Sequence, residues 1–253
     1  MNPEYQSNFS SLYPGAAADV EGRRRKARTI AAVFADFVGG RDRLKQMRLL
    51  DVGAGNGVID HSLGEHFGEV LGIDIDAGMI ARARELTRLA NVSFEVGDAM
   101  QIPVADESFD AVLCAHVYEH VPDAQKLMRE IARVLKPGGV CYFAAGNRYQ
   151  LMEPHYRLPL LSVVPKPMAH LYLRAIGRGR HYYESHLSVG QLRELVRDFT
   201  LHDYTRHLID EPARFEVDYM LRPGSLKHRV ASGIGKFAYV LVPTYIWLLE
   251  KAR

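Results

Sequence analysis

Cysteine and long hydrophobic runs are scarce in this sequence. Only two of the 253 residues are cysteine, and both Cys114 and Cys141 stand in apolar runs, so buried thiols in a reducing compartment are expected rather than disulfides. The chain does not open with the basic and apolar segments of a secretory signal. The most apolar stretch, residues 237–249, is too short to span a membrane and contains Pro243. These shortages predict a cytoplasmic protein with neither a disulfide framework nor a membrane span.

The sequence also lacks an excess of charge of either sign. The sequence has 32 Lys and Arg against 30 Asp and Glu, a formal net charge of +2, which is too small to indicate a nucleic-acid partner. An arginine-rich run at residues 23–28 is interpreted as a solvated helix face, with contact to an anionic substrate or an acidic membrane surface as the alternative. With 47% hydrophobic residues the chain can bury a large core, and one domain with an insertion is the simplest fit.

The most informative stretch is residues 47–57, an apolar run that ends in Gly53, Gly55 and Gly57. The run has the length and composition of a strand buried on both faces of a parallel sheet, and a helix-compatible segment follows at residues 58–67. Glycines at such a turn let the chain bend sharply and let a ligand approach the backbone closely. A strand, a glycine turn and a helix together indicate a nucleotide-type pocket.

The spacing of the glycines limits which nucleotides the predicted pocket could bind. The third glycine stands one residue earlier than in the dinucleotide fingerprint, and no Lys followed by Ser or Thr completes a phosphate loop. A second apolar run, residues 70–73, ends at Asp74, whose carboxylate can accept both hydrogen bonds of a ribose diol. Asp76 is expected to cap the helix that follows. An adenosine without a polyphosphate fits this pattern, and a nicotinamide dinucleotide is disfavoured by it.

These residues resemble the class I S-adenosylmethionine-dependent methyltransferases, in particular those of methyltransferase type 11. Five segments match motifs of that family in order and together span roughly residues 44–146: residues 49–57, 72–74, 94–99, 108–112 and 135–139. The resemblance implies an α/β fold of the Rossmann-like class I type. It has a mostly parallel seven-stranded sheet, helices on both faces and an acceptor-site insertion after the fifth strand.

The resemblance also implies a site for S-adenosylmethionine across the ends of the first four strands. The three glycines would surround its amino-acid part, Asp74 would bind the ribose, and Asp98 would meet the adenine. The expected cofactor-binding residues are Asp51, Gly53, Ala54, Gly55, Gly57, Asp74, Ile75, Asp98, Ala99 and Ala115.

The chain is expected to divide into four consecutive parts of one domain. These are an N-terminal lid and helix (1–43), a cofactor-binding core (44–146), an insertion that caps the acceptor site (147–190), and a C-terminal helix with closing strands (191–253). Within the last part, apolar patterns predict a helix at residues 188–199 and strands at 200–209 and 242–249. A turn at residues 137–139 is expected to lead into the fifth strand.

A cluster after the fourth strand, residues 115–123, is where catalytic chemistry is expected. A base is needed only if the methyl acceptor holds a proton, and imidazoles with pKa values near about 6.5 suit that role. His116, His120 and, in the insertion, His155 are the candidates, although a structural or ligand-packing role is favoured over acid/base service for Glu119 and His120. Ubiquinone O-methyltransferases carry a metal site with the pattern E-x-x-E-H; His116 stands where the first glutamate would be, and no metal is expected.

The insertion is rich in leucine, tyrosine, histidine and arginine, which suggests an apolar or aromatic acceptor that also carries an anionic group. The expected activity is O-methylation of a small metabolite, sugar, quinone or lipid. The alternatives are N- or C-methylation and a non-catalytic protein that binds an adenosine ligand or activates a partner. Peripheral contact with a membrane or lipid is also considered, no nucleic acid is expected, and the oligomeric state is not predicted. The candidate acceptor residues are Tyr13, Tyr118, Asn147, Tyr156, Tyr182 and Tyr183.

Overall fold

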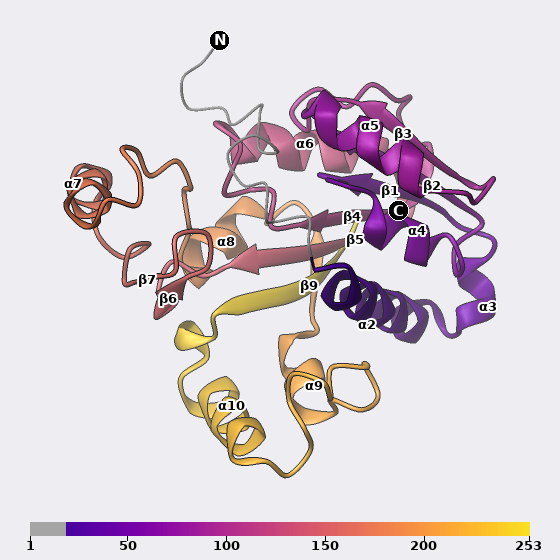
Figure 1. Ribbon diagram of the computed structural model, residues 1–253. Helices are drawn as coiled ribbons and strands as arrows, with labels where there is room; N and C mark the ends of the chain where they lie inside the picture. Colours follow the sequence, from indigo (N-terminus) through magenta and orange to yellow (C-terminus); the bar gives the residue numbers. More distant parts are fainter. Residues whose placement is uncertain (1–18) are drawn as a thin grey trace.

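The computed structural model describes residues 19–253, and within that range seven strands form a central sheet (Figure 1). The strand order is β3-β2-β1-β4-β5-β9-β8, and β9 alone of these seven runs antiparallel to its neighbours. The mostly parallel seven-stranded sheet is therefore confirmed. The strands are β1 (Arg48–Val52), β2 (Glu69–Asp74), β3 (Val92–Val96), β4 (Phe109–Ala115), β5 (Leu135–Gly146), β8 (Thr200–Asp203) and β9 (Thr244–Glu250).

Helices cover both faces of this sheet, as expected for strands that are apolar on both sides. Alternate residues of β1 show why: Leu49 belongs to the core beneath α2 and α5, whereas Leu50 belongs to the core beneath α6 and α8. The helices among the described residues are α2 (Val20–Val38), α3 (Arg41–Leu44), α4 (Val58–Leu63), α5 (Ala77–Leu86), α6 (Ala124–Val134), α7 (Lys166–Ile176), α8 (Val189–Leu195), α9 (Thr205–Asp210), α10 (Leu226–Phe237) and the 3₁₀ helix η2 (Tyr239–Leu241).

Short-range signals set most helix ends. Asp76 caps α5 by accepting hydrogen bonds from the N–H groups of Gly78 and Met79, at 2.9 and 3.2 Å, which confirms the expected cap. Ser188 begins α8 with a reciprocal capping box. Gly39 ends α2 in the left-handed region, at φ 84°. Such caps stabilise a helix by about 1 kcal/mol each and fix where the following loop starts.

Two expectations for the sheet were wrong in detail. The strand predicted at residues 200–209 ends at Asp203, because this carboxylate accepts a hydrogen bond from the N–H of Thr205 (3.0 Å) and turns the chain into α9. The turn predicted at residues 137–139 lies inside β5 as an irregularity, since Phe109 pairs with Leu135 but the next aligned pair joins β4 to Val140.

The insertion after β5 forms a small layer with its own core. It contains the hairpin of β6 (Met152–Glu153) and β7 (Leu158–Pro159), followed by α7, around a cluster that includes Leu161 and Leu173. Figure 1 shows the hairpin beyond the end of β5 and α7 further out on the same side. The side chain of Asn147 donates hydrogen bonds to the carbonyls of Val240 and Val242, which joins the base of the insertion to η2.

Candidate active site

The glycine turn after β1 depends on glycine at each of its three positions. Gly53, Gly55 and Gly57 have φ values of 86°, 56° and 73°, in the region that side chains disfavour. A Cβ on Gly53 would lie 2.7 Å from Val117, and one on Gly57 would lie 2.6 Å from the ring of Phe94. The turn is therefore held tight both by its dihedral angles and by the side chains packed around it.

Asp74 stands beside this turn at the end of β2. One carboxylate oxygen accepts a hydrogen bond from the N–H of Gly55 and the other from the N–H of Asp76, both at 2.9 Å. Burial raises the pKa of Asp74, and these two backbone hydrogen bonds oppose the rise. The carboxylate of Asp74 is therefore half-buried and held in one orientation next to the glycine turn. Ile75 follows it in the chain.

Asp98 and Ala99 lie at the start of the loop that joins β3 to β4. One oxygen of Asp98 accepts a hydrogen bond from the N–H of Met100 at 2.7 Å, which turns the chain locally, and Ala99 is buried next to it. At the end of the neighbouring strand, Ala115 is half-buried. The four strand ends expected to carry the cofactor thus each supply residues to one edge of the sheet.

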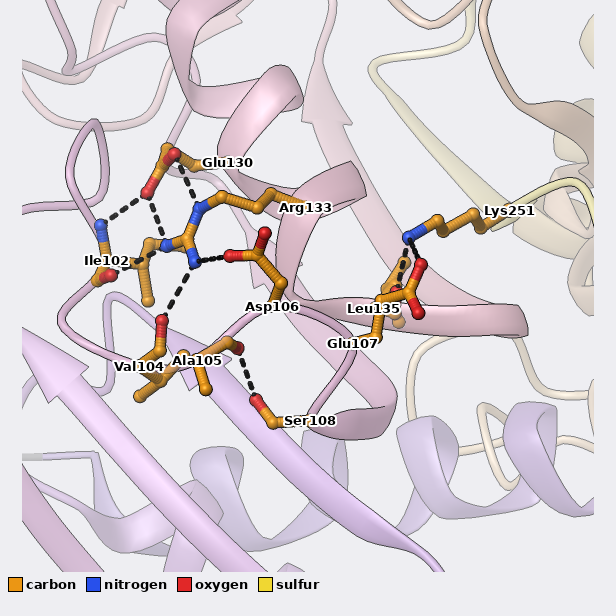
Figure 2. Close-up of polar contacts among 10 residues, drawn as sticks. All are labelled: Ile102, Val104, Ala105, Asp106, Glu107, Ser108, Glu130, Arg133, Leu135 and Lys251. Carbon is orange, nitrogen blue, oxygen red and sulfur yellow. Dashed lines mark hydrogen bonds and ion pairs between the residues drawn. The ribbon is translucent and has the colours of Figure 1, made fainter.

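The loop that carries Asp98 is fastened to α6 by an ionic clamp, drawn in Figure 2. Arg133 donates hydrogen bonds to the carbonyls of Ile102 and Val104, each at 2.8 Å, and pairs with Glu130. Glu130 in turn accepts a hydrogen bond from the N–H of Ile102 at 2.7 Å. Because three backbone groups of the loop are tied to one helix, the position of Asp98 depends on α6.

A buried acidic pair lies under the glycine turn, and half of it was missed from the sequence. Asp51 in β1 and Asp60 in α4 are both buried, and burial together with their mutual repulsion raises the pKa of Asp51. Burial also raises the pKa of Asp60, while the charge of Arg23 on α2 opposes the rise in both. The available signal was an acidic residue in the first turn of the helix that follows Gly57.

His116 and Glu119 form a pair at the end of β4. His116 has a φ of 60°, unusual for a residue with a side chain, and its Nδ1 lies 3.2 Å from Oε1 of Glu119. The imidazole is 43% exposed, whereas the carboxylate is 1% exposed. Burial alone would raise the pKa of Glu119, but the hydrogen bond to His116 and the charges of His116, His120 and His186 outweigh it and lower the pKa to about 2. An ionised, buried carboxylate therefore orients an exposed imidazole.

The other two candidate histidines face each other behind this pair. The rings of His120 and His155 meet edge to face, with centroids 4.9 Å apart, and Nδ1 of His155 lies 2.7 Å from Oε1 of Glu153. Burial lowers the pKa of His120 to about 4. Burial would also lower the pKa of His155, but the hydrogen bond to Glu153 and the charges of Glu184 and Glu153 raise it. Two imidazoles from separate segments are thus in contact: that of His120, whose lowered pKa favours the neutral form, and that of His155, whose raised pKa favours the protonated form.

Three further residues of this cluster were missed from the sequence. Glu153 and Glu184 are fully buried, and burial raises the pKa of Glu184. His186 stacks on Tyr182, whose hydroxyl lies 3.0 Å from its Nδ1. The only signal in the sequence was the presence of two glutamates in a segment whose other charged residues are basic.

The candidate acceptor residues occupy different settings. Tyr118 is buried, donates a hydrogen bond to the carbonyl of Gly146 (2.5 Å) and accepts one from the N–H of Leu187 (3.1 Å). Asn147 is likewise buried and engaged with backbone groups. Tyr156 and Tyr183 line a cavity of about 430 Å³ beside the hairpin, whereas Tyr182 is buried in the core of the insertion. Tyr13 lies outside the described residues.

The described residues bear on two expectations, the absence of a metal and the absence of a membrane span. Within residues 19–253, no three His, Cys, Asp or Glu side chains are grouped so that they could hold a metal ion. In the same range, none of the helices has the length and apolar character needed to cross a membrane.

Comparison with known proteins identifies the family. The family described as "Methyltransferase domain" matches residues 50–143, which cover the glycine turn, Asp74, Asp98 and β4. The chain is an S-adenosylmethionine-dependent methyltransferase. Among the relatives of this methyltransferase is a "Ubiquinone biosynthesis O-methyltransferase" of Xanthomonas oryzae pv. oryzae, 28% identical over 80% of the chain and 86% of the relative.

Solved structures show the same fold for this methyltransferase. A putative sarcosine dimethylglycine methyltransferase from Galdieria sulphuraria is 20% identical and covers 90% of the chain, with 86% of its own length covered and a TM-score of 0.56. A chain in the complex of the Haloferax volcanii Trm112 methyltransferase activator with a putative methyltransferase is 22% identical, with coverages of 94% and 96% and a TM-score of 0.55.

Proposed function

We propose that this methyltransferase methylates an oxygen atom of a small-molecule acceptor. The observation that carries the proposal is the pair of exposed His116 and buried, ionised Glu119 at the end of β4. Bound S-adenosylmethionine supplies an activated methyl group, and a base is required only where the accepting atom still holds a proton, as in a hydroxyl. His116 would take that proton on Nε2 while Glu119 holds Nδ1 and stabilises the imidazolium.

The described residues fit S-adenosylmethionine. The glycine turn leaves backbone where a Cβ would stand, and Asp74 offers a fixed carboxylate for a ribose diol. Asp98 lies on a loop held by Arg133, so it can meet an adenine at a set distance from the sheet edge. Burial raises the pKa of Asp51 and raises that of Asp60 to about 7, so a sulfonium or ammonium group bound at the turn above them would favour their ionisation. The metal-free reaction and the cytoplasmic location remain parts of this proposal.

An apolar or aromatic acceptor is supported by relatives named for ubiquinone biosynthesis and by the make-up of the insertion. His120, His155, Tyr156 and Tyr183 are proposed to face it. N- or C-methylation and a non-catalytic role as a ligand-binding or partner-activating protein are the alternatives.

Peripheral membrane contact is part of the proposal because apolar and basic residues occur together in two segments. Twelve of the seventeen exposed large hydrophobic residues in the described chain fall within residues 149–176 and 226–241. Residues 147–183 and 222–243 together hold ten Lys and Arg and a single acidic residue, the buried Glu153, whereas the rest of the chain holds 22 Lys and Arg against 29 Asp and Glu. Exposed apolar side chains among basic ones suit an anionic lipid surface.

Vesicle sedimentation tests the membrane contact. Leu171→Asp on α7 should weaken binding to vesicles of phosphatidylglycerol and phosphatidylcholine, because an exposed apolar residue becomes acidic. Leu86→Asp on α5, which is also exposed but lies outside the two segments, is the matched control. Equal binding of both variants and the wild type would contradict the contact.

Methyl-label transfer tests the activity. Purified protein is given S-adenosylmethionine with an isotopic methyl group and an extract of the source cells, and the products are partitioned into organic, aqueous small-molecule and macromolecular fractions. Label that is recovered in a small molecule as an alkali-stable ether supports O-methylation. Label in macromolecules, or none despite measured cofactor binding, contradicts it.

A matched pair of variants tests the base. His116→Asn should lower kcat by about 10²- to 10⁴-fold at neutral pH, because it removes the imidazole while asparagine tolerates the positive φ. His207→Gln, an exposed histidine on α9, should leave kcat unchanged. An unchanged kcat in His116→Asn would refute the role of His116.

A further inference from the structure

The insertion contains a cavity of about 430 Å³ whose lining is strongly basic. It lies between the hairpin of β6 and β7 and the segment that follows α7. Of the described residues that line it, none is acidic. Those with basic side chains are His155, Arg157, Arg178, Arg180 and His181.

We infer that the acceptor carries a phosphate ester, held in this cavity by Arg157, Arg178 and Arg180. The inference rests on the proposed function and names the substrate class of the same site. It identifies the ligand by its chemistry, since a phosphate ester can belong to a soluble metabolite or to a lipid headgroup.

The arginines are positioned by the fold. Arg178 donates a hydrogen bond to the carbonyl of Tyr156 at 2.6 Å, which uses one of its five N–H groups and directs its guanidinium to the hairpin turn. Buried Glu153 shapes that turn by accepting hydrogen bonds from the N–H of Tyr156 and from His155, each at 2.7 Å. The turn brings Arg157 to the cavity at a φ of 52°.

No carboxylate among the described residues pairs with the three arginines of the cavity. Arg157, Arg178 and Arg180 form no ion pair within the described part of the chain. Arginines that face one cavity without carboxylates repel one another, and a bound dianion would remove that repulsion. Guanidinium groups bind phosphate oxygens through paired N–H donors, which suits this ligand better than a single lysine would.

The cavity connects to the proposed base through neighbouring side chains. His155, which lines the cavity, packs against His120, and His120 adjoins Glu119, the partner of His116. An acceptor anchored by its phosphate in the cavity would therefore extend past the histidines toward the end of β4. The anchor would act on binding and orientation, and the base on the proton.

Calorimetric titration with phenyl phosphate tests the inference without methyl transfer. The wild-type protein should bind phenyl phosphate saturably, and Arg157→Gln combined with Arg180→Gln should weaken it at least tenfold. Arg193→Gln, an exposed arginine on α8, is the matched control and should bind like the wild type. Equal binding by all three proteins, or binding of phenol as tight as that of phenyl phosphate, would overturn the inference.

A second ligand separates the two sources of phosphate. Dihexanoyl phosphatidic acid, a soluble short-chain lipid, should bind more tightly than phenyl phosphate if the natural ligand is a lipid, with the same loss in the double variant. Tighter binding of phenyl phosphate supports a soluble metabolite, and failure of both probes overturns the inference. Titration with S-adenosylmethionine should give wild-type affinity in every variant, which shows that the fold is intact. Phosphate binding without methyl transfer would contradict only the proposed function.

Discussion

Two parts of this methyltransferase are held in different ways: the part proposed to bind the cofactor, or cofactor side, and the part proposed to bind the acceptor, or acceptor side. The turn that carries Gly53 and Gly57 is defined by backbone dihedral angles, close packing and main-chain hydrogen bonds to Asp74. The acceptor side is defined by charged side chains: buried Glu119 pairs with His116 and buried Glu153 with His155. The imidazoles of His120 and His155 meet there from separate segments. The glycine turn has no room for a Cβ at Gly53 or Gly57, whereas the glutamate–histidine pairs depend on which of their groups are protonated. Substitutions should therefore damage the two sides through different measurable quantities.

The largest effect is expected at the glycine turn. Gly57→Ala puts a Cβ 2.6 Å from the ring of Phe94 and 2.7 Å from the Cβ of Ala83, at a φ of 73°. Strain and overpacking together should lower the free energy of unfolding by about 4 kcal/mol, measured by urea denaturation. Gly190→Ala on α8 meets nothing within 4 Å and should change that free energy by less than about 1 kcal/mol. Equal effects in the two variants would show that the turn is not tightly packed.

Glu119→Gln tests the ionic side through its pH dependence. The pKa of Glu119 is about 2 in the folded protein, below the ordinary value of 4.5, so the ionised carboxylate stabilises the fold above pH 4.5 and this contribution is lost as pH falls toward 2. The shift corresponds to about 3 kcal/mol at pH 7. Urea denaturation should show the wild type more stable than the variant at pH 7, with a smaller difference at pH 3. A difference that does not change with pH would contradict the ionic interpretation.

Asp74→Asn tests whether the cofactor side needs charge as well as shape. The amide keeps the size of the carboxylate but loses one acceptor oxygen and the negative charge, so affinity for S-adenosylmethionine should fall by about 30-fold, or about 2 kcal/mol, by calorimetry. Asp76→Asn preserves the cap of α5 and should leave that affinity unchanged. Wild-type affinity in Asp74→Asn would exclude the ribose contact.

The smallest effect is expected at the clamp in Figure 2. Arg133→Gln removes the hydrogen bonds to Ile102 and Val104, so the loop that carries Asp98 is held less firmly. Thermal unfolding should show a Tm lower by about 3–6 °C, and cofactor affinity should fall a few-fold. Arg129→Gln on the same helix, where the side chain is 64% exposed, is the control. A Tm equal to that of the control would show that the clamp does not hold the loop.

Sequence patterns predicted the cofactor side better than the acceptor side, because short-range signals define the first and contacts between distant residues define the second. The glycine spacing, the cap at Asp76 and the alternation of β1 are short-range signals, so the sheet and its helices could be predicted from them. The end of β8 at Asp203 depends on one side-chain hydrogen bond, which overrides an apolar strand-like pattern. Asp60 could not be assigned because its meeting with Asp51 is made only by the folded chain.

The gathering of Glu153, Glu184 and His186 is likewise a product of tertiary structure. These residues come from the hairpin and from the segment after α7, and no fixed spacing links them to His116. Charged residues are usually exposed, so two buried glutamates in a basic insertion contradict the ordinary expectation for their type. The roles given to these residues and to the predicted site residues remain predictions for the experiments above.

The hydroxyl of Tyr118 donates a hydrogen bond to Gly146, just before the insertion, and accepts one from Leu187, close to its end. The N–H of Arg148 also donates a hydrogen bond to the carbonyl of Leu187 at 3.0 Å, so the two ends of the insertion leave the sheet at one point. Because the cost of closing a loop grows slowly with its length, the segment between these ends can be lengthened, shortened or exchanged with little effect on the strands. The insertion, which is proposed to cap the acceptor site, is thus a replaceable module. A chimera that carries the insertion of another methyltransferase, joined at Gly146 and Leu187, should retain cofactor binding while its acceptor changes.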